Sequence, residues 1–243
     1  MRAAVFAARN AKELLRDPVS PLFGVGLPLA LLVLMNLIRQ RAGDAAVMFE
    51  LERFTPGIAM FSLTFLSMFT AMLVAGDREN AFLTRLFASP MTEAQFLAGY
   101  CLPLLPLGMI QGALCFAAAM FLGLHPTVGV LYCLAAMIPA VLLATALGLL
   151  LGSVLRYRQV GPVASLLVQA AALTSGMWFE LDWIGGVFQK ICLLLPFAHT
   201  LELMRGALEG SWAGMGGHLL WLAGYTAAAA LAAGLLFCRQ MDR

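Results

Sequence analysis

The sequence predicts an all-α integral membrane protein with six transmembrane helices, in a single domain of residues 1–243. Of these 243 residues, 62% are hydrophobic and only 12% are charged, whereas about 25% are charged in a typical soluble domain. Five stretches contain no Asp, Glu, Lys or Arg, and each is long enough for the roughly 20 apolar residues that cross a bilayer. They are residues 18–38, 54–76, 94–155, 159–179 and 210–238.

The stretch 94–155 is too long for one span, and Gly123–Thr127 in its middle is a turn-forming segment. It is therefore expected to hold two spans. The six spans are expected at residues 22–38, 56–75, 101–124, 128–155, 163–179 and 219–238.

The basic residues predict the orientation of these spans. If the N-terminus lies in the cytoplasm, ten of the fifteen Lys and Arg residues fall on inside segments and five on outside segments. This asymmetry follows the positive-inside rule. It places both termini, and the polar segment 77–100, in the cytoplasm.

Residues 1–17 predict an interface helix, an amphipathic helix that lies on the membrane surface. One side of its helical wheel carries Ala and Leu, and the other side is charged. The charged side consists of Arg2, Arg9, Lys12, Glu13 and Arg16. Val5 and Phe6 fit this wheel poorly. The alternative interpretation is a basic flank that serves only the positive-inside rule.

The segment 77–100 carries the clearest amphipathic helix pattern outside the spans. Four apolar side chains recur at helical spacing and form one stripe, which we call the 82–87 stripe. They are Phe82, Leu83, Leu86 and Phe87. Arg78 and Arg85 fall elsewhere on the helix. Because almost no soluble chain surrounds this stripe, we expect another protein to bury it.

The ends of this short helix are marked in the sequence. Asp77 is expected to cap its N-terminus, with Glu79 favourable in the first turn. Ser89 and Pro90 are expected to end it, because the residue before a proline is restricted away from the helical region.

The second and fifth spans carry candidates for a substrate path. Adaptable Met and flat Phe side chains suit a variable apolar substrate; the alternative interpretation is a stripe that faces lipid or packs against other helices. The candidates are Phe61, Phe65, Met68, Met72, Gln169 and Met177. Gln169 is expected to be buried and to need a polar partner, either a substrate or a neighbouring helix.

The third and fourth spans carry small residues every four positions, which let helices approach closely. These are Gly108 and Gly112 in one span and Ala136, Ala140, Ala144, Gly148 and Gly152 in the other. We expect these rows to serve packing within the chain.

Residues 180–211 are expected to form an outer re-entrant segment. The apolar run Ile191–Leu201 has 11 residues and contains Pro196, so it is too short to cross. It is expected to dip in and return, or to lie at the outer interface with nearby tryptophans as anchors.

Neither the cysteines nor the histidines predict chemistry. The five cysteines form no CxxC pair and are interpreted as apolar packing residues. The three histidines lack the spacing of metal ligands. We therefore expect no catalytic residue and no metal site.

The order of these features resembles the membrane subunit of ABC-2 type ABC transporters, which shares its transmembrane fold with the ABCG exporters. Four sequence elements carry the resemblance over essentially the whole chain. They are LLRDP at 14–18, Asp77-Arg78-Glu79 followed by Leu86 and Ser89-Pro90, SGMWF at 175–179, and LLLPFAHTLELMRG at 193–206.

The resemblance implies that residues 77–90 contain a coupling helix that docks on an ATPase subunit. It implies that the segment after the fifth span caps the outer end of the path. Six spans are half of the usual family set, so it also implies a second permease, in a homo- or heterodimer, and two ABC ATPase subunits. The implied location is the bacterial cytoplasmic membrane, and no nucleic-acid partner is expected.

The sequence has no P-loop of its own. That motif needs Gly-Lys followed by Ser or Thr, but the only lysines, Lys12 and Lys190, follow Ala11 and Gln189. ATP and Mg²⁺ are therefore expected on the partner ATPase, and no cofactor on this chain. The leading function is ATP-driven export of a hydrophobic or amphipathic compound, such as a drug, a peptide antibiotic or a lipid.

Two other classes of function compete with export. An intramembrane enzyme needs Asp, Glu or His at membrane depth, and the predicted spans contain none. An ATP-independent channel or a membrane-complex assembly subunit is compatible with the topology. That alternative would leave the 82–87 stripe without a role.

Overall fold

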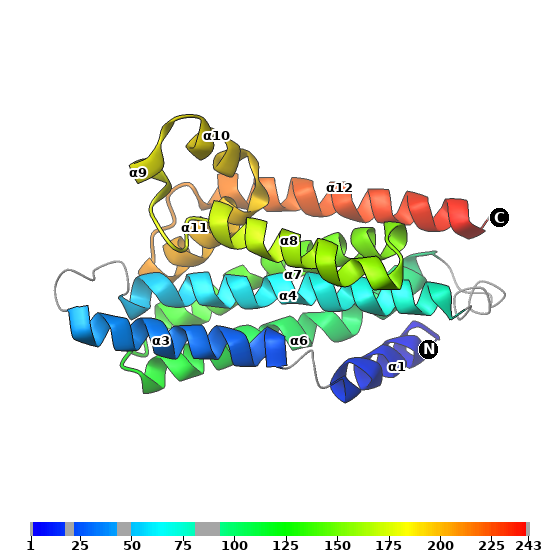
Figure 1. The fold of residues 1–243 in the computed structure, drawn as a ribbon, viewed down its shortest axis with the longest axis horizontal. Helices are drawn as coiled ribbons and strands as arrows, with labels where there is room; N and C mark the ends of the chain where they lie inside the picture. The colour runs from blue at the N-terminus through cyan, green and yellow to red at the C-terminus, as the bar shows by residue number, and fades with distance from the viewer. Residues whose placement is uncertain (1, 18–21, 43–49, 81–92, 242–243) are drawn as a thin grey trace.

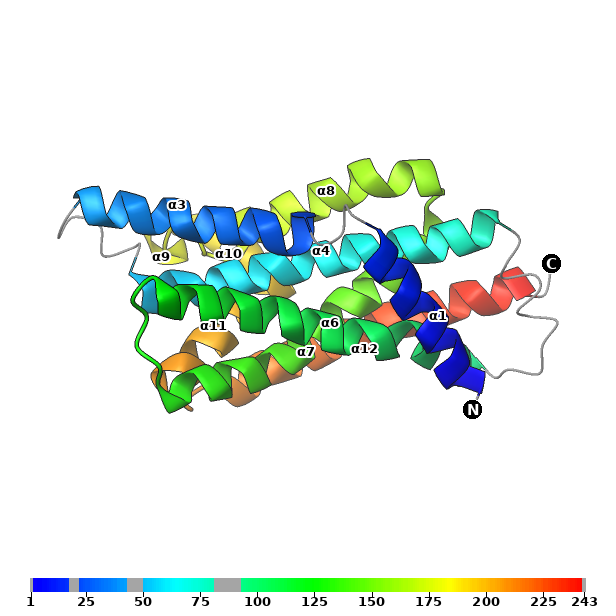
Figure 2. The ribbon, with the colours of Figure 1, turned by 90° about the horizontal axis from the view of Figure 1, so that it is seen from below.

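The computed structural model describes residues 2–17, 22–42, 50–80 and 93–241, and every regular element in these ranges is a helix. The elements in chain order are α1 (Arg2–Arg16), the π-helix η1 (Leu22–Gly26), α3 (Leu27–Ala42), α4 (Leu51–Glu79), α6 (Glu93–Phe121), α7 (Val128–Val154), α8 (Tyr157–Thr174), α9 (Leu181–Ile184), α10 (Gly186–Leu194), α11 (Pro196–Glu209) and α12 (Met215–Met241). The long helices run side by side in one bundle, and both chain termini lie at the same end of it (Figures 1 and 2). We call this the α1 end.

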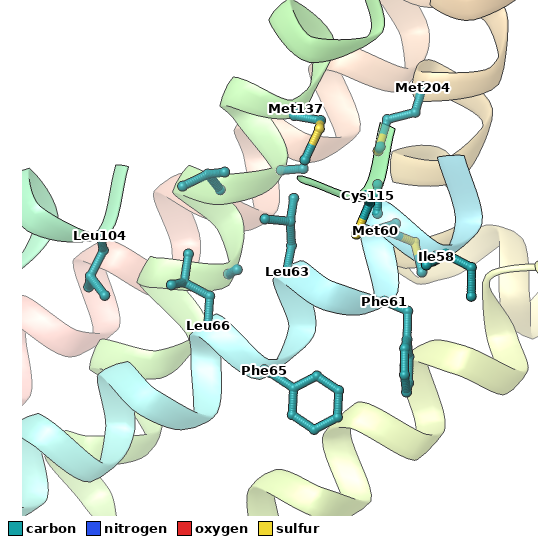
Figure 3. Close-up of a cluster of buried hydrophobic side chains, with 14 of the residues drawn as sticks. Ile58, Met60, Phe61, Leu63, Phe65, Leu66, Leu104, Cys115, Met137 and Met204 are labelled. Atoms are coloured by element: carbon teal, nitrogen blue, oxygen red, sulfur yellow. The ribbon is translucent and has the colours of Figure 1, made fainter. Parts of the chain in front are cut away.

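Helix α4 is the axis of the bundle. Its most apolar stretch is 94% buried, whereas that of α12 is 17% buried, so α12 lies at the periphery. One continuous apolar core surrounds α4, and in Figure 3 its Leu63 and Leu66 lie in one cluster with Leu104 of α6 and Met137 of α7. A movement of α4 therefore acts directly on its neighbours.

Small residues bring α7 close to α4, as the four-residue spacing predicted. A Cβ atom placed on Gly148 of α7 would lie 2.6 Å from the carbonyl oxygen of Ser67 on α4. One placed on Gly152 would lie 2.8 Å from the carbonyl oxygen of Ala71. Only a glycine fits at such distances from a neighbouring backbone.

Within the described ranges, five helices are long and apolar enough to cross a membrane, or six candidates if the bent pair α10–α11 is counted as one span. The five comprise Leu22–Arg41, Leu51–Glu79, Ala98–Phe121, Val128–Val154 and Met215–Phe237. The fifth predicted span corresponds to α8, which has 18 residues, is not among these five, and packs along α4. It ends at Thr174, and Gly176 then adopts a φ of +80°, in the left-handed region that glycine favours. The predicted span of residues 163–179 was therefore too long at its C-terminal end.

The predicted outer segment folds as α9, α10 and α11 at the end opposite α1 (Figure 1). Helices α10 and α11 meet at Leu195 with a bend of 80°. Pro196 occupies the start of α11, where its missing N–H needs no partner. A pair bent this sharply fits either the re-entrant segment that the short proline-containing run predicted or one broken span.

Helix α1 is the predicted N-terminal helix, but its apolar face packs on protein. Phe6, which fitted the predicted wheel poorly, is buried, and its ring meets Tyr100 of α6 edge-on with centroids 4.9 Å apart. Phe6 also packs on Gly99, which has no side chain to exclude it. Lys12 and Arg16 remain exposed on the other face.

Candidate coupling site at the α1 end

Asp77 lies inside α4, so its predicted role as a helix cap is wrong. Helix α4 continues to Glu79, four residues beyond the predicted end of the second span. The Asp77 side chain is only 2% exposed. It stays in the helix because it finds charged and polar partners within the bundle.

The Asp77 carboxylate is held from two sides. Arg9 of α1 donates through Nη1 to Oδ2 and through Nη2 to Oδ1, each at 2.7 Å. The hydroxyl of Tyr100 on α6 donates to Oδ2, also at 2.7 Å. A two-pronged guanidinium contact is the strong, directional form of such a pair. Asp77 thereby ties α4 to both α1 and α6.

Neighbouring groups on α1 orient Arg9. Its guanidinium also reaches Asn10 Oδ1 at 3.0 Å and Glu13 Oε2 at 2.7 Å. Burial opposes the charged form of Arg9, but the hydrogen bond and charge of Asp77 outweigh burial and raise the pKa of Arg9. Burial raises the pKa of Glu13, and the Arg9 charge opposes that rise. Asn10 donates to the Gly99 carbonyl at 3.1 Å, which fixes α1 on α6.

Arg78 points in another direction, toward the end of α7. Its Nη1 donates to the carbonyl oxygens of Gly152 at 2.7 Å and Leu155 at 3.2 Å. The last carbonyls of a helix have no partner within the helix and carry its negative dipole end. A guanidinium satisfies both needs, so Arg78 caps α7.

Glu79 reaches the start of α8. Its Oε1 accepts from the backbone N–H of Tyr157 at 2.8 Å. The first N–H groups of a helix lack partners and favour a negative charge. Glu79 of α4 therefore caps α8, although Glu79 and Tyr157 are 78 positions apart in the sequence. We call Asp77, Arg78, Glu79 and the groups they bind the α4 clamp.

The remaining predicted coupling residues lie outside the described residues. They are Phe82, Leu83, Arg85, Leu86, Phe87, Ser89 and Pro90. Their assignment to ATPase docking stays a prediction. The described chain places the α4 clamp immediately before them, with Asn80 ending α4.

The structure does not bring the six path candidates into one surface. Phe61 and Phe65 are buried in an aromatic cluster with Phe23 and Phe69. Met68 and Met72 lie half-buried against α8. Met177 is buried in the turn after α8, against Gly57 of α4.

Gln169 is exposed on this chain, so its predicted burial is wrong. Helix α8 packs inward through a different face. The buried positions of that face are Val160, Ala164, Val168, Ala171 and Ala172. Gln169 and Ser165 fall on the opposite side. The polar group is therefore presented at the surface of the bundle.

Two cavities are relevant to the position of a substrate path. One, of about 20 Å³, lies between α4, α7 and α11, with Thr64, Ala144 and Thr200 in its lining and Leu167 of α8 at its side. This volume suits roughly a single water molecule. A larger cleft of about 320 Å³ lies at the α1 end, and its lining includes Met72 and Glu13.

Comparison with known proteins identifies the family of this chain. The sequence model of the ABC-2 type transporter family matches residues 3–208. The chain belongs to this family. It is an ABC-2 permease, a multi-pass membrane component, and such permeases work with ABC ATPase subunits. A search of the curated proteins returns no match.

Sequence reasoning missed the partners of the α4 clamp in this permease. Arg9 appeared only as part of a charged wheel face, and Tyr100 and the Tyr157 N–H carried no signal, because each meets α4 through tertiary packing.

A contact between two histidines at the opposite end was also missed. His199 Nδ1 lies 2.8 Å from His218 Nδ1, joining α11 to α12. Among the residues that the structure describes, no three His, Cys, Asp or Glu side chains are grouped to hold a metal ion.

Proposed function

We propose that this permease is the membrane subunit of an ATP-driven exporter of hydrophobic or amphipathic compounds. It works with two ABC ATPase subunits and a second permease in the bacterial cytoplasmic membrane. The observation that carries the proposal is that segment 81–92 directly follows α4, the most buried of the candidate spans. A displacement of that segment by the ATPase would therefore be transmitted directly to α4, the axis of the bundle.

Two features support a position for the substrate path: the small size of the cavity inside the bundle and the polar side chains on the exposed face of α8. The cavity between α4, α7 and α11 is far too small for a drug or a lipid. Helix α8 presents Ser165 and Gln169 on its exposed face. Polar side chains on a spanning helix favour a protein or aqueous surface over lipid. These features support a path between two permeases along α8.

The variant Leu86→Asp tests the docking of the ATPase. Burial of one such side chain contributes about 1.5 to 3 kcal/mol, and Asp would also leave a charge unpaired in the contact. We expect Leu86→Asp to insert into the membrane normally but to lose the ATPase subunit on affinity pull-down. Transport should be lost with it.

Thr84→Asp is the matched control, because it adds the same charge in the same segment away from the 82–87 stripe. It should retain the ATPase. Unchanged pull-down with Leu86→Asp would show that the ATPase docks elsewhere, and transport by the permease alone would favour a channel.

Cysteine labelling tests the proposed orientation. Trp183 on α9 and Arg158 in the first turn of α8 are both exposed, and α9 and the start of α8 lie toward opposite ends of the bundle (Figure 1). In a Cys-free background, we expect an impermeant maleimide to label Trp183→Cys in intact cells. Arg158→Cys should react only after permeabilisation. The reverse pattern would place the 82–87 stripe outside and refute ATPase docking there.

A further inference from the structure

The three consecutive side chains of the α4 clamp reach four different helices. Asp77 binds α1 and α6, Arg78 binds the end of α7, and Glu79 binds the start of α8. Successive residues of a helix point about 100° apart, so three in a row can address separate neighbours. The clamp lies at the last turn of α4, immediately before segment 81–92.

The contact between α4 and α8 is smooth where the two helices meet near the clamp. Its fully buried positions are Ala71 and Ala75 on one side and Val160 and Ala164 on the other, with the half-buried Met68 and Met72 of α4 packed against them. The small side chains permit close approach, and the unbranched Met side chains are flexible and adapt to a shifted neighbour. Apolar packing alone therefore does little to fix how far α8 slides along α4.

Polar contacts fix that position at both ends. At the α1 end, Glu79 binds the Tyr157 N–H and Arg78 binds the Leu155 carbonyl, so both hold the connection between α7 and α8. At the other end, Arg53 of α4 forms an ion pair with Glu180, which follows α8. Helix α8 is thus attached to α4 before it begins and after it ends.

We propose that Arg78 and Glu79 are positioning residues that transmit displacement of segment 81–92 to the α7–α8 connection. This proposal rests on the proposed function, in which the ATPase pushes on that segment. Asp77 carries the same displacement to α1 and α6 through Arg9 and Tyr100. The clamp therefore transmits displacement of segment 81–92 to two sets of helices. Asp77 transmits it to α1 and α6, and Arg78 and Glu79 transmit it to α8 through the α7–α8 connection.

Hydrogen exchange on the assembled permease–ATPase complex in lipid nanodiscs tests this division. Amide exchange is compared between the ADP state and the state trapped with ATP and vanadate. In the wild type, we expect a nucleotide-dependent difference both at residues 152–160 and in α1. In Arg78→Gln, ATPase pull-down should be retained, and the difference at residues 152–160 should fall at least tenfold. The difference in α1 should persist.

Conservative and matched variants separate transmission from general loosening. Arg78→Lys keeps a cationic donor and should restore part of the response. Arg158→Gln removes the same charge from an exposed site near the same connection. In this variant, the nucleotide-dependent exchange difference at residues 152–160 should equal that of the wild type. If Arg78→Gln does not accumulate, Glu79→Ala gives the same test, with Glu79→Gln as the variant that keeps the acceptor oxygen.

Each outcome decides the proposal. A contact that is only structural would change exchange equally in both nucleotide states and leave their difference intact, which would overturn the inference. Equal loss in Arg78→Gln and Arg158→Gln would also overturn it. A wild-type permease that captures no ATPase would instead refute the proposed function.

Discussion

Replacing Arg9 by alanine is expected to lower the free energy of unfolding by about 3 kcal/mol. Breaking a buried ion pair costs about 3 to 5 kcal/mol, because the remaining charge is left without a counter-ion. Asp77 is that remaining charge, and it is 2% exposed. The lower end of the range applies because the Arg9 side chain is 36% exposed. Denaturant titration in mixed micelles measures the change.

The control for this prediction lies on the same helix. Lys12 has the same charge and is exposed on α1, so Lys12→Ala should change the free energy of unfolding by less than about 0.5 kcal/mol. Equal effects of the two variants would mean that the Arg9–Asp77 pair does not stabilise the permease.

The pair should also be asymmetric. Asp77→Asn leaves Arg9 with Glu13 and with water, so it should cost less than Arg9→Ala, which leaves a carboxylate inside the bundle. Adding Asp77→Asn to Arg9→Ala removes the buried charge and should recover part of the loss. Strictly additive effects would contradict a direct interaction between the two side chains.

The sequence was informative where one local property decides the structure. Charge-free stretches predicted the long helices, because a bilayer excludes unpaired charge. The small-residue row ending in Gly148 and Gly152 predicted a close helix contact, because only small side chains fit there. Pro196 in a short apolar run predicted the bent pair α10–α11.

Prediction failed where a distant partner decides the structure. Hydropathy ended the second span at residue 75, yet α4 continues to Glu79 because Arg9, two α7 carbonyls and the Tyr157 N–H replace water around its charges. Gln169 was predicted to be buried, but the choice of the inward face of α8 depends on Ala71 and Ala75 of α4. Neither relation is encoded within a single helix.

The variant Gly148→Leu is expected to disrupt the bundle at its axis. A Cβ atom at position 148 would lie 2.4 Å from Thr70 Cβ and 2.6 Å from the Ser67 carbonyl oxygen on α4. Overpacking typically costs about 1 to 3 kcal/mol, and occasionally more. We expect at least the upper end, about 3 kcal/mol, because backbone atoms cannot yield as a flexible side chain can.

A matched series on a peripheral helix tests this prediction. A Cβ atom at Gly234 of α12 would meet nothing within 4 Å, so Gly234→Ala should be neutral or stabilise by up to about 1 kcal/mol through helix propensity. Gly234→Leu should also extract as a monodisperse protein. Gly148→Ala should fall between the wild type and Gly148→Leu in thermal midpoint and in monodisperse yield. If both Gly148 variants matched their Gly234 counterparts, α7 would not rest directly on α4, and the bundle would not have α4 as its axis.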